Sequence, residues 1–182
     1  MKKVKYIILI FILIIVFGFI SFFVTRKFIY PLKYTGYVEK YSEEYGIDKY
    51  FIYALIKAES NFDQDANSSK GAIGLMQLME NTANETSEKI GVEDVDLYDE
   101  ETNIRIGTKY ISDLIDLYEG NINLAIIAYN AGTGNVNKWI KEGVIEKDGS
   151  NLDNVPFKET RDYAKKILLN YKFYKVLYEY EF

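Results

Sequence analysis

The chain has 182 residues, enough for one domain with a hydrophobic core and a short appended segment. It contains no cysteine and no histidine, which excludes a disulfide framework, a thiolate nucleophile, a histidine-containing zinc site and a Ser-His-Asp triad. Beyond residue 27 it carries 17 basic and 27 acidic residues, a formal charge of −10 without a basic cluster, so nucleic-acid binding is not expected.

The N-terminal segment is strongly apolar. Residues 6–24 form an uncharged run of 19 positions, preceded by Lys2, Lys3 and Lys5. A helix of that length spans about 28 Å, close to the ~30 Å hydrocarbon core of a bilayer. The run is too long for a signal peptide and has neither a small-residue cleavage site nor a lipobox cysteine. We therefore predict an uncleaved membrane anchor over residues 1–27, with the spanning helix at about residues 6–24.

The rest of the chain has a helical period. Residues 28–36, with Pro31 and Gly36, are expected to be a linker, and residues 37–182 a single domain. Apolar spacing and capping residues predict helices at residues 37–45, 48–59, 82–90, 104–118, 121–130, 136–142 and 160–180. A short extended stretch is expected at most within residues 71–78. The predicted fold class is therefore mainly α, preceded by one N-terminal transmembrane helix.

Glu59 is the first candidate for chemistry. Ile52, Leu55, Ile56 and Glu59 follow one another at i, i+3, i+4 and i+7, which places the carboxyl on the apolar side of its helix. Burial raises the pKa of a carboxyl group, and a protonated carboxylic acid is what cleavage of a glycosidic bond requires. The spacing alone favours a simpler interpretation, because a Glu at a helix end is more often a partly exposed or capping residue.

Four motifs follow in order: ESNF from Glu59, GAIGLMQ from Gly71, AYNAG from Ala128 and PFKETRDY from Pro156. With the intervening segment DEETNIRIGTKYI, they resemble the catalytic domain of the soluble lytic transglycosylase (SLT) family, a branch of the lysozyme-like superfamily. The resemblance covers about residues 37–178. It implies a lysozyme-like helical domain of the goose-type/SLT kind.

The resemblance also implies site residues. Glu59 matches the catalytic Glu of the family. The positions that match substrate-binding residues of its cleft are Ser68, Met76, Gln77, Tyr129, Asn130, Glu159 and Tyr163. Without the motifs, Gln77 would be interpreted as a surface residue, and Tyr129 as a core tyrosine about as readily as a cleft residue.

The activity implied is that of a peptidoglycan lytic transglycosylase. Glu59 would protonate the β-1,4 bond between N-acetylmuramic acid and N-acetylglucosamine and then act as base, leaving 1,6-anhydro ends. Asp63 and Asp65 could supply a second carboxylate, but their polar loop indicates solvated residues. No metal or organic cofactor is expected.

Three alternatives stay open. A muramidase of the same fold would hydrolyse the same bond, and a non-catalytic glycan-binding module would bind strands without cutting them. A role in a wall-spanning secretion or conjugation machinery is compatible with catalysis. The expected partners are glycan strands and, through the N-terminal helix, the membrane. The basic residues at both ends of that helix do not orient it, so the domain is placed extracytoplasmically because of its expected substrate.

Overall fold

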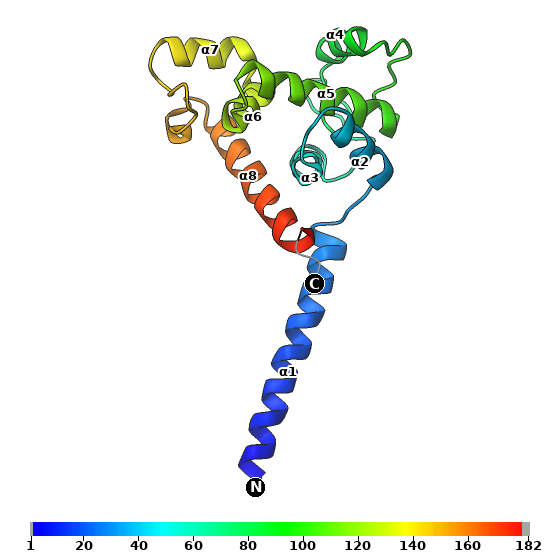
Figure 1. The fold of residues 1–182 in the computed structure, drawn as a ribbon, viewed down its shortest axis with the longest axis vertical. Helices are drawn as coiled ribbons and strands as arrows, with labels where there is room; N and C mark the ends of the chain where they lie inside the picture. The colour runs from blue at the N-terminus through cyan, green and yellow to red at the C-terminus, as the bar shows by residue number, and fades with distance from the viewer. Residues whose placement is uncertain (1, 180–182) are drawn as a thin grey trace. The chain divides into compact units, whose positions relative to one another are not determined.

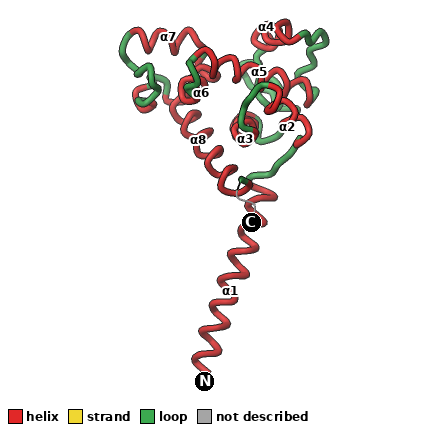
Figure 2. The backbone as a smooth tube through the Cα atoms, in the orientation of Figure 1, coloured by secondary structure: helices red, strands yellow, loops and turns green. Residues whose placement is uncertain are grey.

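The computed structural model describes residues 2–179 and is helical almost throughout (Figures 1 and 2). It divides into two compact units, Met1–Lys33 and Tyr34–Phe182. The mainly α fold class is confirmed. The predicted domain boundaries at residues 27 and 36 stay predictions.

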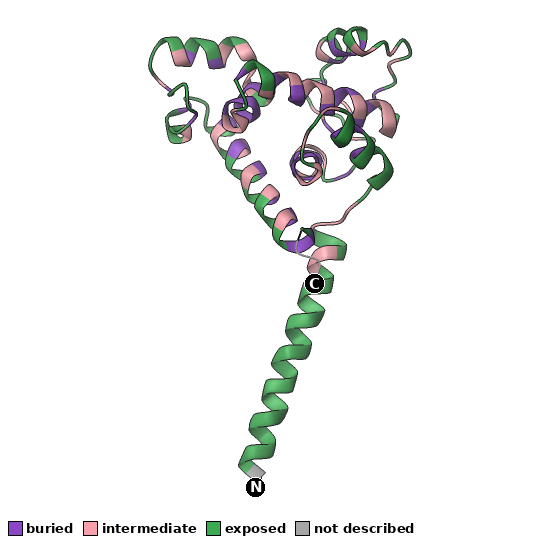
Figure 3. Cartoon of the chain, in the orientation of Figure 1, coloured by how far each residue is buried: buried purple, intermediate pink, exposed green. Residues whose placement is uncertain are grey.

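The first unit is an apolar helix. It comprises α1, Lys2–Val24, and a π-helical turn η1, Thr25–Ile29. The segment Lys3–Ile29 is long and apolar enough to cross a membrane, and none of its most apolar stretch is buried by protein. Figure 3 shows α1 exposed along its described length. A signal sequence near the N-terminus passes the same test of length and composition, so the uncleaved anchor stays a prediction.

The second unit is a bundle of seven α-helices with one short 3-10 turn among its described residues. Their bounds are α2 Thr35–Glu44, α3 Lys49–Glu59, α4 Glu80–Ile90, α5 Glu100–Leu117, α6 Ile122–Ala131, α7 Thr133–Lys141, η2 Leu152–Asn154 and α8 Lys158–Tyr178. Every expected helix is present within a few residues, and the predicted end of the last helix at residue 180 lies outside the described residues. The largest shift is at α5, which begins at Glu100 because the Asp99 carboxylate accepts a hydrogen bond from the Thr102 amide and caps the helix there.

Helix α3 lies at the centre of this unit. It packs against α2 and α8, while α6 contacts α5, α7 and α8 (Figure 1). Six consecutive α3 residues, 51–56, are buried, so α3 has no solvent-facing stripe over that stretch. The Tyr53 ring stacks on Tyr174 of α8 with centroids 5.6 Å apart. This packing fixes the middle of α3 against the second half of α8.

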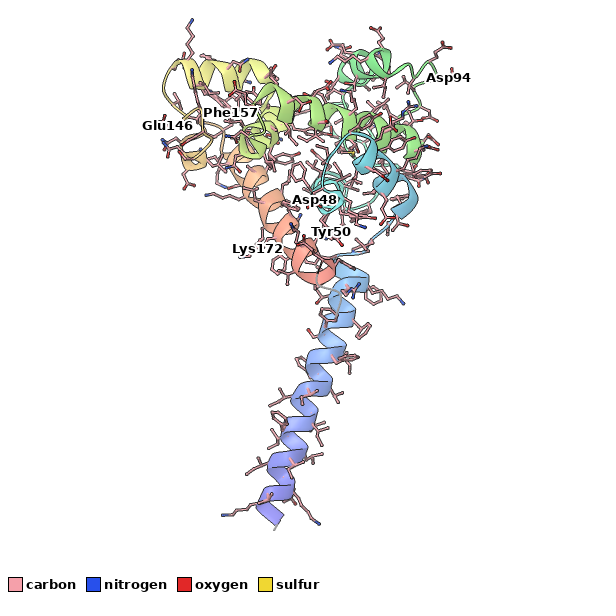
Figure 4. All side chains as sticks on the ribbon, viewed as in Figure 1. Asp48, Tyr50, Asp94, Glu146, Phe157 and Lys172 are labelled. Atoms are coloured by element: carbon pink, nitrogen blue, oxygen red, sulfur yellow. The ribbon has the colours of Figure 1, made fainter. Side chains whose placement is uncertain are left out.

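The N-terminal end of α3 is also tied to α8. The Asp48 side chain caps α3 and accepts a hydrogen bond of 2.7 Å from the Tyr171 hydroxyl. The Tyr50 hydroxyl donates to the Tyr178 carbonyl at 3.0 Å. Figure 4 labels Asp48 and Tyr50 at this end of the helix. The two helices are therefore held together at the N-terminal end and at the middle of α3, which limits rotation of α3 about its axis.

The long connection between α3 and α4 contains the expected extended stretch. It forms isolated β-bridges between Asn67 and Ile73 and between Ile73 and Leu78. The buried Asn103 side chain of α5 anchors it, accepting from the Met76 amide at 2.8 Å and donating to the Ile73 and Leu97 carbonyls. Gly74 is required here, because a Cβ atom would lie 2.2 Å from the Asn103 side-chain nitrogen.

Candidate active site

Glu59 is the last residue of α3. Its side chain contacts α8, which lies at the far end of the domain's sequence. Its side chain is partly buried, and Oε1 accepts a 2.5 Å hydrogen bond from the Tyr163 hydroxyl, 104 residues away. The apolar spacing of α3 therefore predicted correctly that the Glu59 carboxyl lies on the side of the helix that faces the domain interior. The Glu59 carboxyl and the Tyr163 hydroxyl form the centre of the candidate site.

The surroundings of Glu59 favour its protonated form. Burial raises the pKa of Glu59 from its ordinary 4.5 to about 7, although the hydrogen bond from Tyr163 and the positive charge of Lys166 act in the opposite direction. A carboxyl group with this pKa is protonated in a substantial fraction of molecules at neutral pH. It can therefore give a proton and, once ionised, accept one back.

Two more tyrosines extend the site. The Tyr129 hydroxyl of α6 donates to the Met76 carbonyl at 2.8 Å, and the Tyr129 and Tyr110 ring centroids lie 5.1 Å apart. Burial, reinforced by the nearby Glu59 carboxylate, raises the pKa of both Tyr129 and Tyr163 well above the ordinary value. Both hydroxyls therefore stay neutral, so they can donate hydrogen bonds without adding negative charge beside Glu59.

The GAIGLMQ loop uses its polar side chains to hold its own backbone. The Ser68 hydroxyl accepts from the Ala72 amide at 2.9 Å. The Gln77 side-chain nitrogen donates to the Ala66 and Gly74 carbonyls at 3.1 and 3.0 Å, and Gln77 itself has a positive φ of 48°. These contacts define the shape of the loop. A direct role for either side chain toward a ligand stays a prediction.

Asn130 and Glu159 lie at the entrance to α8. Asn130 is exposed and accepts a 2.7 Å hydrogen bond from the Thr160 hydroxyl, which joins the end of α6 to the start of α8. The exposed Glu159 carboxylate lies 3.6 Å from the Lys70 ammonium on the GAIGLMQ side. The structure therefore brings together Glu59, Tyr129 and Tyr163, with Asn130 and Glu159 nearer the surface.

The Met76 side chain lies in the core of the domain and not on the wall of a cleft. Its side chain is fully buried against Gly107, where a Cβ atom would lie 2.4 Å from the Met76 sulfur, and only its carbonyl reaches Tyr129. Met79, three residues later, is 45% exposed and lines a groove. Sequence reasoning missed Met79 because it lies just outside GAIGLMQ. Its position directly before α4 was the only sequence feature that could have indicated an exposed side chain.

Two grooves lie on this part of the domain. One, of about 410 Å³, is lined by Asn67, Lys70, Gly71, Ile73, Met79, Glu80 and Asn81. The other, of about 710 Å³, lies between α4, α5 and the start of α7, and includes Tyr110 and Thr133. The Tyr110 ring on its wall packs on Tyr129, which links this groove to the surroundings of Glu59.

The raised pKa of Glu59 predicts a pH-dependent stability. Between its ordinary value of 4.5 and about 7, the folded chain binds a proton that the unfolded chain has lost, so the free energy of unfolding falls as the pH rises through this window. Glu59→Gln removes this term. The stability of E59Q relative to wild type should therefore increase by roughly 1–3 kcal/mol from pH 5 to pH 8. Urea unfolding of the full chain in micelles, followed by Trp139 fluorescence, measures it; a constant difference would contradict the assignment.

Among residues 2–179, no group of three or more carboxylates is placed to hold a metal ion. The expectation that no cofactor is needed stays a prediction.

Comparison with known proteins places this chain in a family. The family model described as transglycosylase SLT domain matches residues 36–150. The chain therefore belongs to the transglycosylase SLT domain family, and the resemblance inferred from the four motifs is confirmed.

Its relatives are lytic murein transglycosylases. The chain is 32% identical to the soluble lytic murein transglycosylase of Salmonella typhimurium over 80% of its own length and 23% of that protein. It is 38% identical to the membrane-bound lytic murein transglycosylase C of Edwardsiella ictaluri, over 57% of this chain and 32% of the relative. The chain spans about a quarter to a third of these curated relatives.

Solved structures agree. An inactive mutant of the lytic transglycosylase Slt from Pseudomonas aeruginosa matches with a TM-score of 0.74 and 35% identity, over 81% of this chain and 24% of the other. The 70 kDa soluble lytic transglycosylase from Escherichia coli matches with a TM-score of 0.73 and 30% identity, over 81% and 25%. At these identities, the helical fold of the matched 81% of the chain is shared with this family.

Proposed function

We propose that residues 37–182 form a peptidoglycan lytic transglycosylase in which Glu59 is first the general acid and then the general base. The observation that carries this proposal is a partly buried carboxyl group, hydrogen-bonded by Tyr163, with a pKa raised to about 7. The family relationship supports it. The similar Pseudomonas aeruginosa structure is an inactive form in which a glutamate is replaced by glutamine.

The proposed reaction has two proton transfers. Protonated Glu59 donates to the oxygen that links C1 of N-acetylmuramic acid to N-acetylglucosamine, and this C–O bond breaks. The N-acetyl group of the muramic acid stabilises the positive charge at C1. The Glu59 carboxylate then removes the proton from the C6 hydroxyl, whose oxygen attacks C1 and closes the 1,6-anhydro ring. Water is not consumed, and Glu59 ends protonated as it began.

A single carboxyl group is favoured by the placement of its neighbours. Asp63 and Asp65 are exposed, and the Asp63 carboxylate accepts a hydrogen bond from the Asp65 amide at 3.1 Å. Glu159 is exposed and paired with Lys70. These three acids are therefore solvated loop or helix-end residues. Their placement supports a mechanism in which a neutral sugar group, rather than a second carboxylate, stabilises C1.

The groove between α4, α5 and the start of α7 is the proposed path for the glycan strand. It has about 710 Å³ of space and a polar wall with hydroxyl, amine and carboxylate groups. The Tyr110 ring on that wall packs on Tyr129. Polar groups beside an aromatic ring suit sugar hydroxyls and the apolar face of a pyranose ring.

Membrane attachment is a further part of the proposal. The apolar helix Lys3–Ile29 would anchor the chain, with the SLT domain on the extracytoplasmic side, where peptidoglycan lies. A similar relative is named as membrane-bound, and others are named as soluble. Such an anchor would suit local opening of the wall around an envelope-spanning assembly.

The products test the proposed chemistry. Purified peptidoglycan treated with the full chain in detergent should yield muropeptides with 1,6-anhydro ends, detected by mass spectrometry as a mass lower by one water than that of the hydrolysed product. Reducing ends would instead assign a muramidase. Binding of glycan with no new ends from the wild-type chain would assign a non-catalytic module.

A further inference from the structure

Helix α8 presents two polar groups to the end of α3. Tyr163 and Lys166 are three residues apart and so lie on one face of α8. The Tyr163 hydroxyl donates to the Glu59 carboxyl, and the Lys166 ammonium donates a 2.7 Å hydrogen bond to the Ala58 carbonyl. Ala58 immediately precedes Glu59, so the two contacts hold adjacent residues of α3.

The hydrogen bond from Lys166 satisfies a carbonyl in the last turn of α3. The last carbonyls of a helix lack partners within the helix and carry the negative end of its dipole. An ammonium group satisfies one of these carbonyls and brings a positive charge beside the final residue, which here is Glu59. This charge opposes the effect of burial on the Glu59 pKa.

The other polar groups around Glu59 do not lower its pKa by a positive charge, as Lys166 does. Tyr163 from α8 and Tyr129 from α6 are neutral at physiological pH, because burial raises the pKa of each. Lys57 lies on α3 itself and its ammonium donates to the Asn61 side chain at 3.2 Å. The pKa of Lys57 is lowered by burial and by Lys166, whereas Lys57 does not contribute to the Glu59 shift.

We infer that Lys166 is a positioning residue for Glu59: it fixes the last turn of α3 against α8 and keeps a positive charge beside the carboxyl. The inference rests on the proposed function of Glu59. Its chemical consequence concerns the state after proton donation, in which the carboxylate must persist until the C6 hydroxyl is in place. Loss of the Lys166 charge makes that carboxylate less stable, and loss of the hydrogen bond releases the helix end that carries it.

The test compares variants that separate charge from hydrogen bonding. Lys166→Met removes both, Lys166→Gln keeps an amide donor without the charge, and Lys166→Arg keeps the charge. Lys165→Met is the matched control, because Lys165 is the neighbouring lysine and pairs with Asp153 at 2.5 Å. The full chain, with ¹³C-labelled Glu carboxyl groups, is titrated by NMR in micelles, and the Glu59 resonance is identified by its absence in E59Q.

The titration midpoint of Glu59 should rise by about one unit in K166M and K166Q, because an opposite charge has been removed. It should stay at the wild-type value in K166R and in K165M. Unchanged midpoints in both K166M and K166Q would overturn the inference. K166Q keeps a hydrogen-bond donor at this position, so it supplies a result even where K166M does not fold.

Turnover gives a second readout. For K166M, kcat should fall while KM stays near wild type, the limb of the pH profile governed by Glu59 should move to higher pH, and K166R should restore both. A merely structural lysine would lower the amount of folded enzyme without moving the pH profile, and that result would also overturn the inference. The NMR midpoints can be measured without any turnover. If the wild-type chain does not cleave glycan, that result refutes the proposed function, and the midpoints still test the contact between Lys166 and Glu59.

Discussion

Replacing Glu59 with glutamine should lower the turnover of purified peptidoglycan by about 10³-fold, since a positioned acid/base group contributes about 10²–10⁴ in rate. Gln keeps the size of the side chain and can still accept the hydrogen bond from Tyr163, but it has no acidic proton to transfer. The initial rate of muropeptide release, measured by liquid chromatography and mass spectrometry, gives the effect.

The matched control for this prediction is Asp65→Asn. Asp65 is six residues from Glu59, is exposed, and undergoes the same change from carboxylate to amide. Its turnover should stay within about a factor of two of wild type, because surface substitutions of this kind change stability by less than ~0.5 kcal/mol. If E59Q retained most of its activity, or if D65N lost as much as E59Q, Glu59 would not be the acid.

Replacing Asn103 with alanine should lower the free energy of unfolding by about 3 kcal/mol or more. The Asn103 side chain is buried and makes three hydrogen bonds to backbone groups of Ile73, Met76 and Leu97. Each buried group left without a partner costs about 1–3 kcal/mol. The Met76 carbonyl binds Tyr129, so glycan cleavage should fall together with stability. Urea unfolding monitored by Trp139 fluorescence measures the first effect.

Asn67→Ala is the corresponding control. The Asn67 side chain is exposed and donates a single hydrogen bond of 3.0 Å to the Tyr98 hydroxyl. Its removal should change the free energy of unfolding by less than about 0.5 kcal/mol. Equal destabilisation by N103A and N67A would show that Asn103 does not anchor the GAIGLMQ loop.

The sequence alone determined the features that arise from local interactions. Apolar residues at helical spacing located all seven helices of the domain. Asp48 caps helix α3 as its side-chain chemistry predicts. The orientation of Glu59 followed from the apolar residues one and two turns before it. These results could be predicted because each depends on residues within a few positions of one another.

Only the tertiary structure decided which groups meet Glu59. Tyr163 and Lys166 lie more than 100 residues further along the chain and reach the end of α3 because α8 packs along that helix. Packing of the loop against α5 buries Met76 beneath Gly107, whereas Met79 stays exposed, which the GAIGLMQ motif does not distinguish. The pKa of a carboxyl group depends on burial and on nearby charge, and both are set by helices that become neighbours only when the chain folds.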